Sequence, residues 1–295
     1  MPDAETHIRA GLESLRILDA SAACTASISP YSSGLFQIYL IKPVATQTHS
    51  TDSRIPSCII AKSVPLTMAE AECDGLRALR DAGANTPDLY GTYDTGKEAI
   101  IYLEFCDGTA RRAPGLKKLY AAKQDYWGYM RNNFIGRLPQ NNSRHGSFAD
   151  FWWLDRIEPQ LRLARDSLLL DQSDQKTAEQ IVTSLSLKWN LSEIGPRLIH
   201  GDLWNGNVLG DESGEAVLID PSVSFGHPEQ DLAMLELFGS PLPDREIDEI
   251  AKHIGVSPGR KERVPFFQLY PLLVHVNLFG QSYVSGVRRI LKKYV

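Results

Sequence analysis

Apolar positions follow two different patterns along the chain, and the change comes near residue 106. Before it, short runs of β-branched and apolar residues stand between polar loops, as is typical of strands. Four strands are predicted in this part: residues 35–41, 57–64, 89–94 and 99–105. Apolar residues at helical spacing predict one main helix at residues 67–82, which ends at Gly83. A short amphipathic helix is predicted at residues 4–18, and a polar hairpin loop at residues 45–54.

After Cys106 the pattern becomes mainly helical. A turn-rich link at residues 107–115 leads into helical segments that include residues 148–169 and the segment after Pro265. A β-rich stretch at about residues 198–224 interrupts them. The predicted fold class is therefore α+β. A small β-rich lobe with one main helix, a short link and a larger helical lobe with an embedded hairpin are typical of a protein-kinase-like fold.

Length and composition exclude several classes of function. A chain of 295 residues, 43% hydrophobic and 23% charged, is long enough for two lobes with separate cores. Its net charge of −5 and the lack of a long Lys/Arg cluster argue against a nucleic-acid partner. The first 18 residues contain acids and no long apolar run, so neither a signal peptide nor a membrane anchor is predicted.

The cysteines indicate a reducing compartment. The four of them, at positions 24, 58, 73 and 106, form no C-x-x-C pair and no metal-ligand cluster. A disulfide framework is not expected, and the cytoplasm is the predicted location. Cys24 lies shortly before a candidate phosphate loop, where a redox role stands beside the simpler interpretation of a buried apolar residue.

The stretch LIHGDLWNGNVLGDESGEAVLIDPS, residues 198–222, carries the most chemistry. Asn207 follows Asp202 by five positions, and Asp220 follows thirteen later, after a turn and the apolar run AVLI. Phosphoryl transfer needs a carboxylate that accepts the proton of the attacking hydroxyl, and oxygen ligands for Mg²⁺. Asp202 supplies the first, and Asn207 with Asp220 supplies the second. The alternative is that His-Gly-Asp opens a tight turn and that Asn207 and Asp220 are surface turn residues. Each residue taken alone is compatible with this alternative, but the occurrence of all of them in this order does not favour it.

A second set of candidate residues lies upstream. Lys62 stands inside the apolar strand IIAKSV, where a buried ammonium group is costly unless it is paired. Glu72 on the predicted helix can be its partner, and in kinases such a pair holds the α- and β-phosphates. The alternative is a lysine on the solvent face of an alternating strand.

The segment SPYSSGLF is the candidate phosphate loop. It predicts a turn formed by Ser32, Ser33 and Gly34 before the strand at residues 35–41. Backbone N–H groups of such a turn can cover phosphate groups. A plain hairpin turn at this place would have the same sequence.

These motifs resemble the fructosamine kinase (ketosamine 3-kinase) family. IHGDLWNGNV, followed by LIDPSVSFGHPEQDLAMLELFG, is similar to the family's sequence, and so are YWGYMRNNFIGRLPQNN and the end, FFQLYPLLVHVNLFGQSYVSGVRRIL. The likeness covers roughly residues 55–292. HGDLW joined to GHPEQDLAM is more specific than the HGD-x4-N core, which choline and aminoglycoside kinases share.

The resemblance implies an enzyme that uses ATP and Mg²⁺ to phosphorylate the 3-hydroxyl of a ketosamine. The acceptor would be a small molecule or a glycated lysine of a protein, as in protein deglycation. Residues 1–105 would form the ATP-binding lobe, and residues 106–295 the catalytic and substrate lobe. Asp202 is then the base, and Asn207 and Asp220 are the metal ligands.

Further roles follow from the same resemblance. Lys62 and Glu72 become the pair that orients the phosphates, and Asp231 becomes a buried helix acid that supports the catalytic loop. An adenine hinge, which binds the base through backbone groups, consists of four residues: Leu103, Glu104, Phe105 and Cys106. The chain departs from the family at Tyr120, where a histidine is usual, and in its glycine-poor phosphate loop.

Trp204 is the residue predicted to select the substrate. Its flat face can cover the apolar face of a sugar or the stem of an amine. A tryptophan of the core is the alternative.

Two other functions use overlapping groups. A kinase of aminoglycosides or of choline-like amines shares the Asp/Asn/Asp set, although Trp204 and GHPEQDLAM favour a ketosamine. A pseudokinase would bind nucleotide as a scaffold without turnover. Pseudokinases usually lack the base, a metal ligand or the lysine, and all of these are present here.

Overall fold

The structure of the chain, a computed structural model, describes residues 2–44 and 56–295. The polar hairpin loop predicted at residues 45–54 lies outside the described residues. Within the described part, no helix combines the length and the apolar character needed to cross a membrane.

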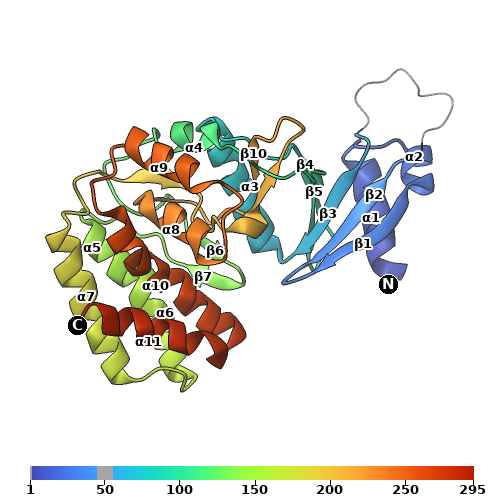
Figure 1. The fold of residues 1–295 in the computed structure, drawn as a ribbon. Coiled ribbons are helices and arrows are strands. Elements are labelled where there is room, and N and C mark those ends of the chain that lie inside the picture. Colours follow the sequence, from blue (N-terminus) through green and yellow to red (C-terminus); the bar gives the residue numbers. More distant parts are fainter. Residues whose placement is uncertain (1, 45–55) are drawn as a thin grey trace. The chain divides into compact units, whose positions relative to one another are not determined.

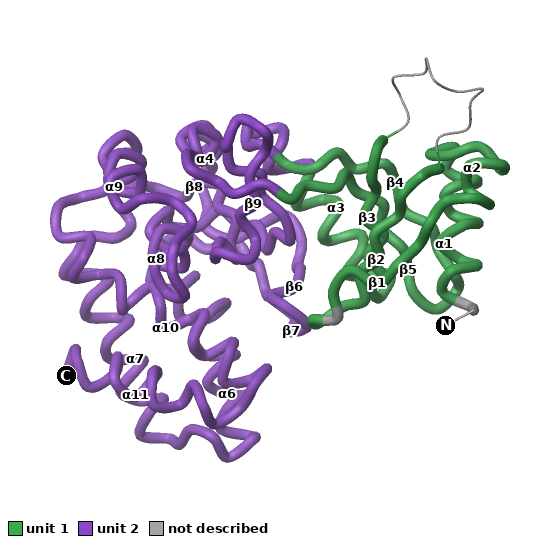
Figure 2. The backbone as a smooth tube through the Cα atoms, turned by 45° about the vertical axis from the view of Figure 1, so that its right-hand side comes forward, with its two compact units in different colours: residues 1–76, 86–107 green, residues 77–85, 108–295 purple. Residues whose placement is uncertain are grey.

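The chain forms two compact units (Figure 2). Unit 1 consists of residues 1–76 and 86–107, and unit 2 of residues 77–85 and 108–295. Each unit therefore contains two separate stretches of the chain. The boundary between the first two stretches falls inside helix α3 (Leu66–Asp81), which begins in unit 1 and ends in unit 2.

Unit 1 is built on a five-stranded antiparallel sheet in the order β1-β2-β3-β5-β4. Its strands are β1 (Ser27–Ser33), β2 (Gln37–Lys42), β3 (Ile59–Val64), β4 (Leu89–Asp94) and β5 (Ala99–Glu104). The four predicted strands are confirmed, with ends shifted by at most two residues. The prediction that Ser32 and Ser33 belong to a turn is wrong, because they pair with β2 at the sheet edge. Pro30 is compatible with this edge position, where its missing N–H breaks no central ladder.

The two faces of this sheet bury separate cores, because successive strand residues point to opposite sides. Ile59 and Ala61 of β3 pack in the core that includes α1 and α2, whereas Ile60 and Val64 pack against α3. The helices of the first core are α1 (Pro2–Ser14) and α2 (Ala20–Thr25), which lie along the sheet in Figure 1. Lys62 has the parity of Ile60 and Val64, so it lies on the side of α3.

The N-terminal helix is shorter than predicted. It ends at Ser14, and Arg16 adopts a left-handed conformation with φ 56°. A second helix then begins after Asp19, whose carboxylate accepts a hydrogen bond from the N–H of Ala22. Cys24 lies exposed in this second helix, so its interpretation as a buried apolar residue is wrong.

Unit 2 combines helices with three two-stranded antiparallel ribbons. The ribbons pair β6 (Asn133–Ile135) with β7 (Leu138–Gln140), β8 (Arg197–Ile199) with β11 (Ser224–Gly226), and β9 (Val208–Gly210) with β10 (Ala216–Leu218). The helices are α4 (Pro114–Leu119), α5 (Phe148–Asp150), η1 (Phe151–Ile157), α6 (Glu158–Asp166), α7 (Gln172–Lys188), η2 (Asn205–Asn207), α8 (Glu229–Leu237), α9 (Asp244–His253), α10 (Arg260–Phe279), η3 (Gln281–Tyr283) and α11 (Val284–Lys293). The predicted β-rich interruption at residues 198–224 is confirmed.

Two apolar clusters stabilise unit 2. One packs η1 and α6 against α7, α10 and α11. The other joins α4, α8 and α9 to the ribbons formed by β8–β11 and β9–β10. The second cluster includes Leu203, Val208 and Leu218, so the segment that carries the candidate chemistry is anchored in a core on both sides of its loop.

The helix predicted at residues 148–169 is divided by a π-helical turn. η1 has the wider π geometry, and α6 follows it with Pro159 near its start. The residues of η1 that are buried are Phe151, Trp152, Asp155, Arg156 and Ile157. Sequence periodicity does not reveal such a turn, and α10 likewise begins at Arg260, ahead of the predicted Pro265.

Candidate active site

The predicted chemical groups of unit 2 meet between η2 and the end of β10. The side-chain nitrogen Nδ2 of Asn207 donates to the backbone oxygen of Asp202 at 2.9 Å and to its Oδ2 at 3.1 Å. The N–H of Ile219 donates to the backbone oxygen of Asn207 at 3.1 Å, beside the paired strands β9 and β10. The fold thus brings Asp202, Asn207 and the residue that precedes Asp220 together.

Asp231 on α8 holds the backbone that leads into Asp202. Its carboxylate accepts the N–H groups of His200 and Gly201, each at 2.8 Å, and the hydroxyl of Tyr120 at 3.1 Å. Burial raises the pKa of Asp231 to about 6, while these three hydrogen bonds act in the opposite direction. Asp231 is therefore a buried helix acid that fixes the loop, as the resemblance implies. Tyr120, where the family usually has a histidine, supplies the third donor.

Close backbone contact explains the glycine in His-Gly-Asp. Gly201 has φ 83°, and a Cβ atom there would lie 2.1 Å from the backbone oxygen of Ser222. The N–H of Ser222 also donates to the backbone oxygen of His200 at 2.8 Å. Asp220 itself has φ 53°, a left-handed conformation that Asp tolerates better than most residues. The loop and the strand end are thus fitted to each other.

His200 links the loop to the strand end as a neutral ring. Its Nε2 lies 2.9 Å from the carbonyl oxygen of Ile219, and the N–H of Asp202 donates to its Nδ1 at 3.2 Å. A carbonyl can only accept, so Nε2 carries the proton and Nδ1 is the acceptor. Complete burial lowers the pKa of His200 to about 4, although the bond to Ile219 and the charge of Asp220 act in the opposite direction.

Asn207 and Asp220 fit a magnesium ion by their chemistry. Asn207 uses its amide nitrogen for Asp202, which turns its Oδ1 away from that residue. An amide oxygen and a carboxylate are hard oxygen donors of the kind Mg²⁺ prefers.

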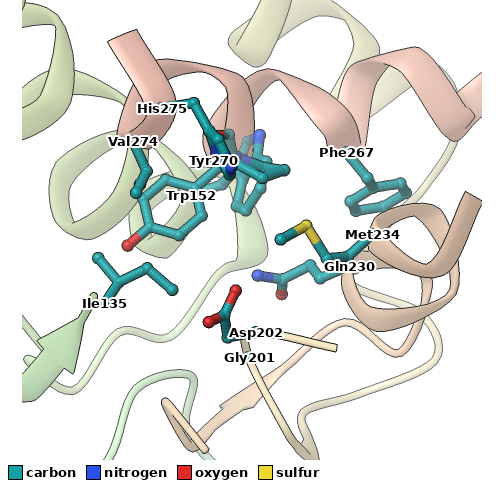
Figure 3. A pocket seen from close by; sticks show the side chains of 11 residues that line it. Ile135, Trp152, Gly201, Asp202, Gln230, Met234, Phe267, Tyr270, Val274 and His275 are labelled. Atoms are coloured by element: carbon teal, nitrogen blue, oxygen red, sulfur yellow. The ribbon is translucent and has the colours of Figure 1, made fainter. Parts of the chain in front are cut away.

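A pocket opens over Asp202 within unit 2 (Figure 3). The space among its lining side chains amounts to about 350 Å³ when the open solvent at its mouth is included. Gln230 and Met234 of α8 line it together with Tyr270 and His275 of α10, and the Asp202 carboxylate is directed into the space between them. Gln230 accepts the N–H of His227 at its Oε1, so its amide nitrogen is the end left for the pocket. A carboxylate and an amide among apolar and aromatic walls suit a small acceptor with hydroxyl groups.

Buried amides support one wall of this pocket. The hydroxyl of Tyr270 donates to Oε1 of Gln140 at 2.7 Å, and Nε2 of Gln140 donates to Oδ1 of Asn133 and to the backbone oxygen of Ser222. Nδ2 of Asn133 donates to the backbone oxygen of Val223 at 2.8 Å. The β6–β7 ribbon therefore ties the pocket wall to the segment that follows the predicted metal ligand. Sequence reasoning noted YWGYMRNNFIGRLPQNN as a likeness but gave its amides no role.

In unit 1, Lys62 and Glu72 form the predicted ion pair. Nζ of Lys62 lies 2.8 Å from Oε2 of Glu72, and Lys62 is only 3% exposed. The ammonium group also lies 5.3 Å from the ring centre of Phe36. The alternative of a lysine on the solvent face is therefore wrong. Whether the pair holds phosphates stays a prediction.

The predicted adenine hinge extends the end of β5. Leu103 is buried in the sheet, and Glu104 exchanges hydrogen bonds with the backbone of Asp88. The ring of Phe105 meets that of Tyr31 edge-on at 5.6 Å. This contact within unit 1 was not foreseen from sequence, because β1 was not predicted.

The other two predicted nucleotide-binding residues lie near the surface of unit 1. Cys106 is half-buried and forms no disulfide. Gly34 is exposed in the turn between β1 and β2, and no described residue comes within 4 Å of where its Cβ would be. Backbone access at this turn is open, as a phosphate-covering loop requires, and its role stays a prediction.

Trp204 follows the His-Gly-Asp loop and is 38% exposed. Its ring covers Gly206, where a Cβ atom would lie 2.4 Å from the indole, and its edge contacts Phe238 at 6.4 Å. The alternative of a core tryptophan is therefore wrong. The indole does not belong to the pocket lining that the described residues form.

The fold and this site define a class. The antiparallel five-stranded sheet and the helical unit with its embedded ribbons are those of an α+β, protein-kinase-like fold. A solved structure of a putative fructosamine-3-kinase from Haemophilus somnus shares this fold with a TM-score of 0.77, at 22% identity and with 91% of each chain covered.

The family follows from sequence comparison. The profile of the fructosamine kinase family matches residues 59–295, and the chain belongs to this family. A probable ketoamine kinase from Enterococcus faecium is 36% identical over 233 residues, which are 76% of this chain and 82% of that protein. A chloroplastic protein-ribulosamine 3-kinase from Oryza sativa subsp. japonica is 31% identical over 245 residues, 78% of this chain and 69% of the relative. The resemblance and the fold class predicted from sequence are confirmed.

Proposed function

We propose that the protein is a ketosamine 3-kinase, which transfers the γ-phosphoryl group of ATP to the 3-hydroxyl of a fructosamine or ribulosamine. Membership of the fructosamine kinase family makes it a phosphotransferase with a hydroxyl acceptor. The observation that carries the proposal is the Asp202 carboxylate, directed into a pocket and held by a loop that buried side chains fix. A rigid base at the floor of an acceptor pocket is what this transfer requires.

Asp202 acts as the general base in this proposal. The sugar hydroxyl donates to its carboxylate, the hydroxyl oxygen attacks the γ-phosphorus, and the bond to the β,γ-bridging oxygen breaks as ADP leaves. Asn207 steadies the carboxylate through Nδ2, and Gln230 can donate to a neighbouring hydroxyl of the sugar. Trp204 covers the exposed side of the acceptor.

Unit 1 supplies the nucleotide groups. Lys62, held by Glu72, orients the α- and β-phosphates, and the turn at Gly34 covers them with backbone N–H groups. The adenine lies against backbone groups of residues 103–106. A magnesium ion held by Asn207 and Asp220 would neutralise phosphate charge.

The physiological setting also belongs to the proposal. None of the four cysteines forms a disulfide, and the cytoplasm is the proposed location. The acceptor is a free ketosamine or a glycated lysine, and its phosphorylation would be a step in protein deglycation. No nucleic acid or membrane takes part.

The alternatives have less support. An aminoglycoside or choline-type kinase would share the fold, but the family match and the named relatives favour a ketosamine. A pseudokinase is disfavoured because none of these groups is missing: Lys62 forms its ion pair within unit 1, and Asp202, Asn207 and Asp220 are present in unit 2.

The test is ADP release with a panel of acceptors. Fructosamines, ribulosamines, choline and an aminoglycoside would be offered with ATP and Mg²⁺, and the phosphorylated carbon located by NMR. We expect turnover with ketosamines and phosphate on O3. Turnover only with choline or the aminoglycoside, or ATP binding without ADP release from any acceptor, would overturn the proposal.

A further inference from the structure

A row of aromatic rings runs along unit 2 beside the Asp202 pocket. Trp204 contacts Phe238 with ring centres 6.4 Å apart, and Phe238 contacts His275 at 4.8 Å. His275 then contacts Phe279 at 5.4 Å and Tyr283 at 4.9 Å. We call these five residues the aromatic shelf. Trp204 directly precedes η2, Phe238 directly follows α8, and the other three members lie in α10 and η3, so chain segments far apart in sequence converge on the shelf.

Local structure explains how the shelf forms. His275 and Phe279 are four residues apart on α10 and so lie on one face of the helix. Gly280 ends the helix with φ 84°, which few residues other than glycine adopt, and η3 follows at once. This turn returns Tyr283 to His275. Phe238 is the residue that directly follows the end of α8 at Leu237.

The shelf is accessible rather than buried. Trp204 is 38% exposed, Phe238 39% and Phe279 52%. Other exposed apolar side chains of unit 2, such as Leu187 on α7, have no comparable place in a row of ring contacts. Single exposed apolar residues are common on proteins, but a contiguous set beside a pocket marks a binding surface.

His275 connects the shelf to the pocket. It lines the same pocket as Asp202, while its ring contacts three other members of the shelf. Its Nδ1 lies 2.7 Å from the carbonyl oxygen of Pro271, which fixes the proton on Nδ1 in the neutral ring. Burial lowers the pKa of His275, so the ring is neutral at pH 7 and its Nε2 is an acceptor. The surface is thus continuous from the base to Phe279.

We propose that the aromatic shelf binds the group carried by the amine of the ketosamine, and that it selects acceptors whose amine bears an apolar or aromatic substituent. This inference rests on the proposed function, because it takes the sugar to occupy the pocket at Asp202. The amine then lies at the pocket mouth, beside the acceptor nitrogen of His275 and the faces of the rings. An aromatic or alkyl substituent removes the shelf from water, whereas a small carboxylate-bearing substituent cannot.

The test compares two acceptors that differ only in this group: 1-benzylamino-1-deoxyfructose and fructosylglycine. Phe279→Ser removes the outermost ring of the shelf without touching the pocket. Leu187→Ser is the matched control, since Leu187 is 75% exposed and lies on α7. For each protein, kcat/KM would be measured for both acceptors, together with KM for ATP. Binding of the benzyl compound would be measured separately by calorimetry.

We expect the wild-type protein to prefer the benzyl compound by about tenfold, and Phe279→Ser to lose about five- to tenfold with this acceptor alone. KM for ATP and all values for Leu187→Ser should stay within about twofold of wild type. The proposed role of the shelf is wrong if the wild-type protein shows no preference between the two acceptors, or if Phe279→Ser loses kcat/KM equally with both. ADP release in the same assays would still support the proposed kinase activity.

The binding measurement separates the two proposals. If no ketosamine yields ADP but Phe279→Ser still weakens benzyl-compound binding about fivefold, the shelf stands and the kinase activity is wrong. If the benzyl compound binds equally well to the wild-type protein and to Phe279→Ser, the shelf is wrong, whatever the turnover.

Discussion

Unit 1 and unit 2 hold their functional charges in different ways. In unit 1, Lys62 is positioned by a side-chain ion pair with Glu72 on a buried sheet face. In unit 2, Asp202 lies on a loop whose backbone N–H groups donate hydrogen bonds to the buried side chains of Asp231 and His200. In unit 1 the charged group is positioned by a side chain of opposite charge. In unit 2 it is positioned because hydrogen bonds fix the main chain that carries it. Substitutions in unit 1 should therefore leave uncompensated charge, and those in unit 2 should move backbone.

The largest expected effect tests the charge that the loop presents. Asp202→Asn keeps the size of the side chain and the backbone oxygen that accepts from Asn207, but it cannot take a proton. We expect kcat to fall by about 10²–10⁴ with nearly unchanged melting temperature and ATP affinity. Single-turnover phosphoryl transfer on the same preparation would measure it. A folded, ATP-binding variant with kcat within about threefold of wild type would contradict the assignment of the base.

The next prediction concerns the ion pair of unit 1. Lys62→Met removes the ammonium group that faces a buried carboxylate, which should cost up to about 3–5 kcal/mol of unfolding free energy. Adding Glu72→Met to the same chain should restore part of the loss, because the double variant buries no charge. Urea unfolding of the two single variants and the double variant gives the coupling. Additive losses would show that the pair does not hold Lys62.

A pH effect is expected in the support of unit 2. His227 directly precedes the turn into α8, the helix of Asp231, and it is fully buried. Burial lowers its pKa from 6.5 to about 3, and the charges of Arg263 and Arg197 act in the same direction. The folded protein keeps the ring neutral while the unfolded chain protonates it. Its contribution to stability is therefore complete above pH 6.5 and is lost as the pH falls.

Urea unfolding at several pH values would measure this effect. Relative to His227→Asn, which cannot titrate, the wild-type protein should lose roughly 3 kcal/mol between pH 6.5 and about pH 4. Glu229 acts with the opposite sign, because burial raises its pKa to about 7 and its protonation favours the folded state as the pH falls. The variant retains Glu229, so the comparison cancels the part of this effect that does not depend on His227, whose Nε2 lies 4.0 Å from Oε1 of Glu229. A difference that does not change with pH would contradict the prediction.

The smallest expected effect isolates the backbone fit. Gly201→Ala places a Cβ atom 2.1 Å from the backbone oxygen of Ser222, whereas Gly195→Ala has the same kind of positive φ and no described atom within 4 Å. Both should lose about 1–2 kcal/mol from the conformation alone. Gly201→Ala should lose more stability and also kcat, because Asp202 must shift. Equal losses, with full activity in Gly201→Ala, would show that the close approach is unimportant.

Much of this arrangement is readable from the sequence. Glu72 is a candidate partner of Lys62 because it lies on the predicted helix, but strand alternation alone also allows Lys62 to face solvent. The structure decides between the two, since Lys62 is buried and paired with Glu72. The order of Asp202, Asn207 and Asp220 predicts their convergence, because a short ribbon must return the chain to its start. Local pattern and chemistry are sufficient for the second inference, whereas the burial of Lys62 needed the structure.

Other features depend on contacts between distant segments. The hydrogen bond of Tyr120 to Asp231 joins residues 111 positions apart, and the amides of Asn133 and Gln140 meet Val223 and Ser222 in the same way. The sequence alone does not show whether an Asn or Gln side chain is buried or exposed. The π-helical turn and the strand β1 were missed for a related reason, since packing overrode the local pattern in both.

The hydrogen bonds that Asp231 accepts from the main chain have a consequence for hydrogen exchange. The amide protons of His200 and Gly201 belong to a segment that lies outside any helix or strand, and such protons usually exchange through small local fluctuations. Here both point at one carboxylate that is itself 1% exposed. Their release requires α8 to separate from the loop, so they should exchange as slowly as the protected amides of the long helices, on the time scale of global opening.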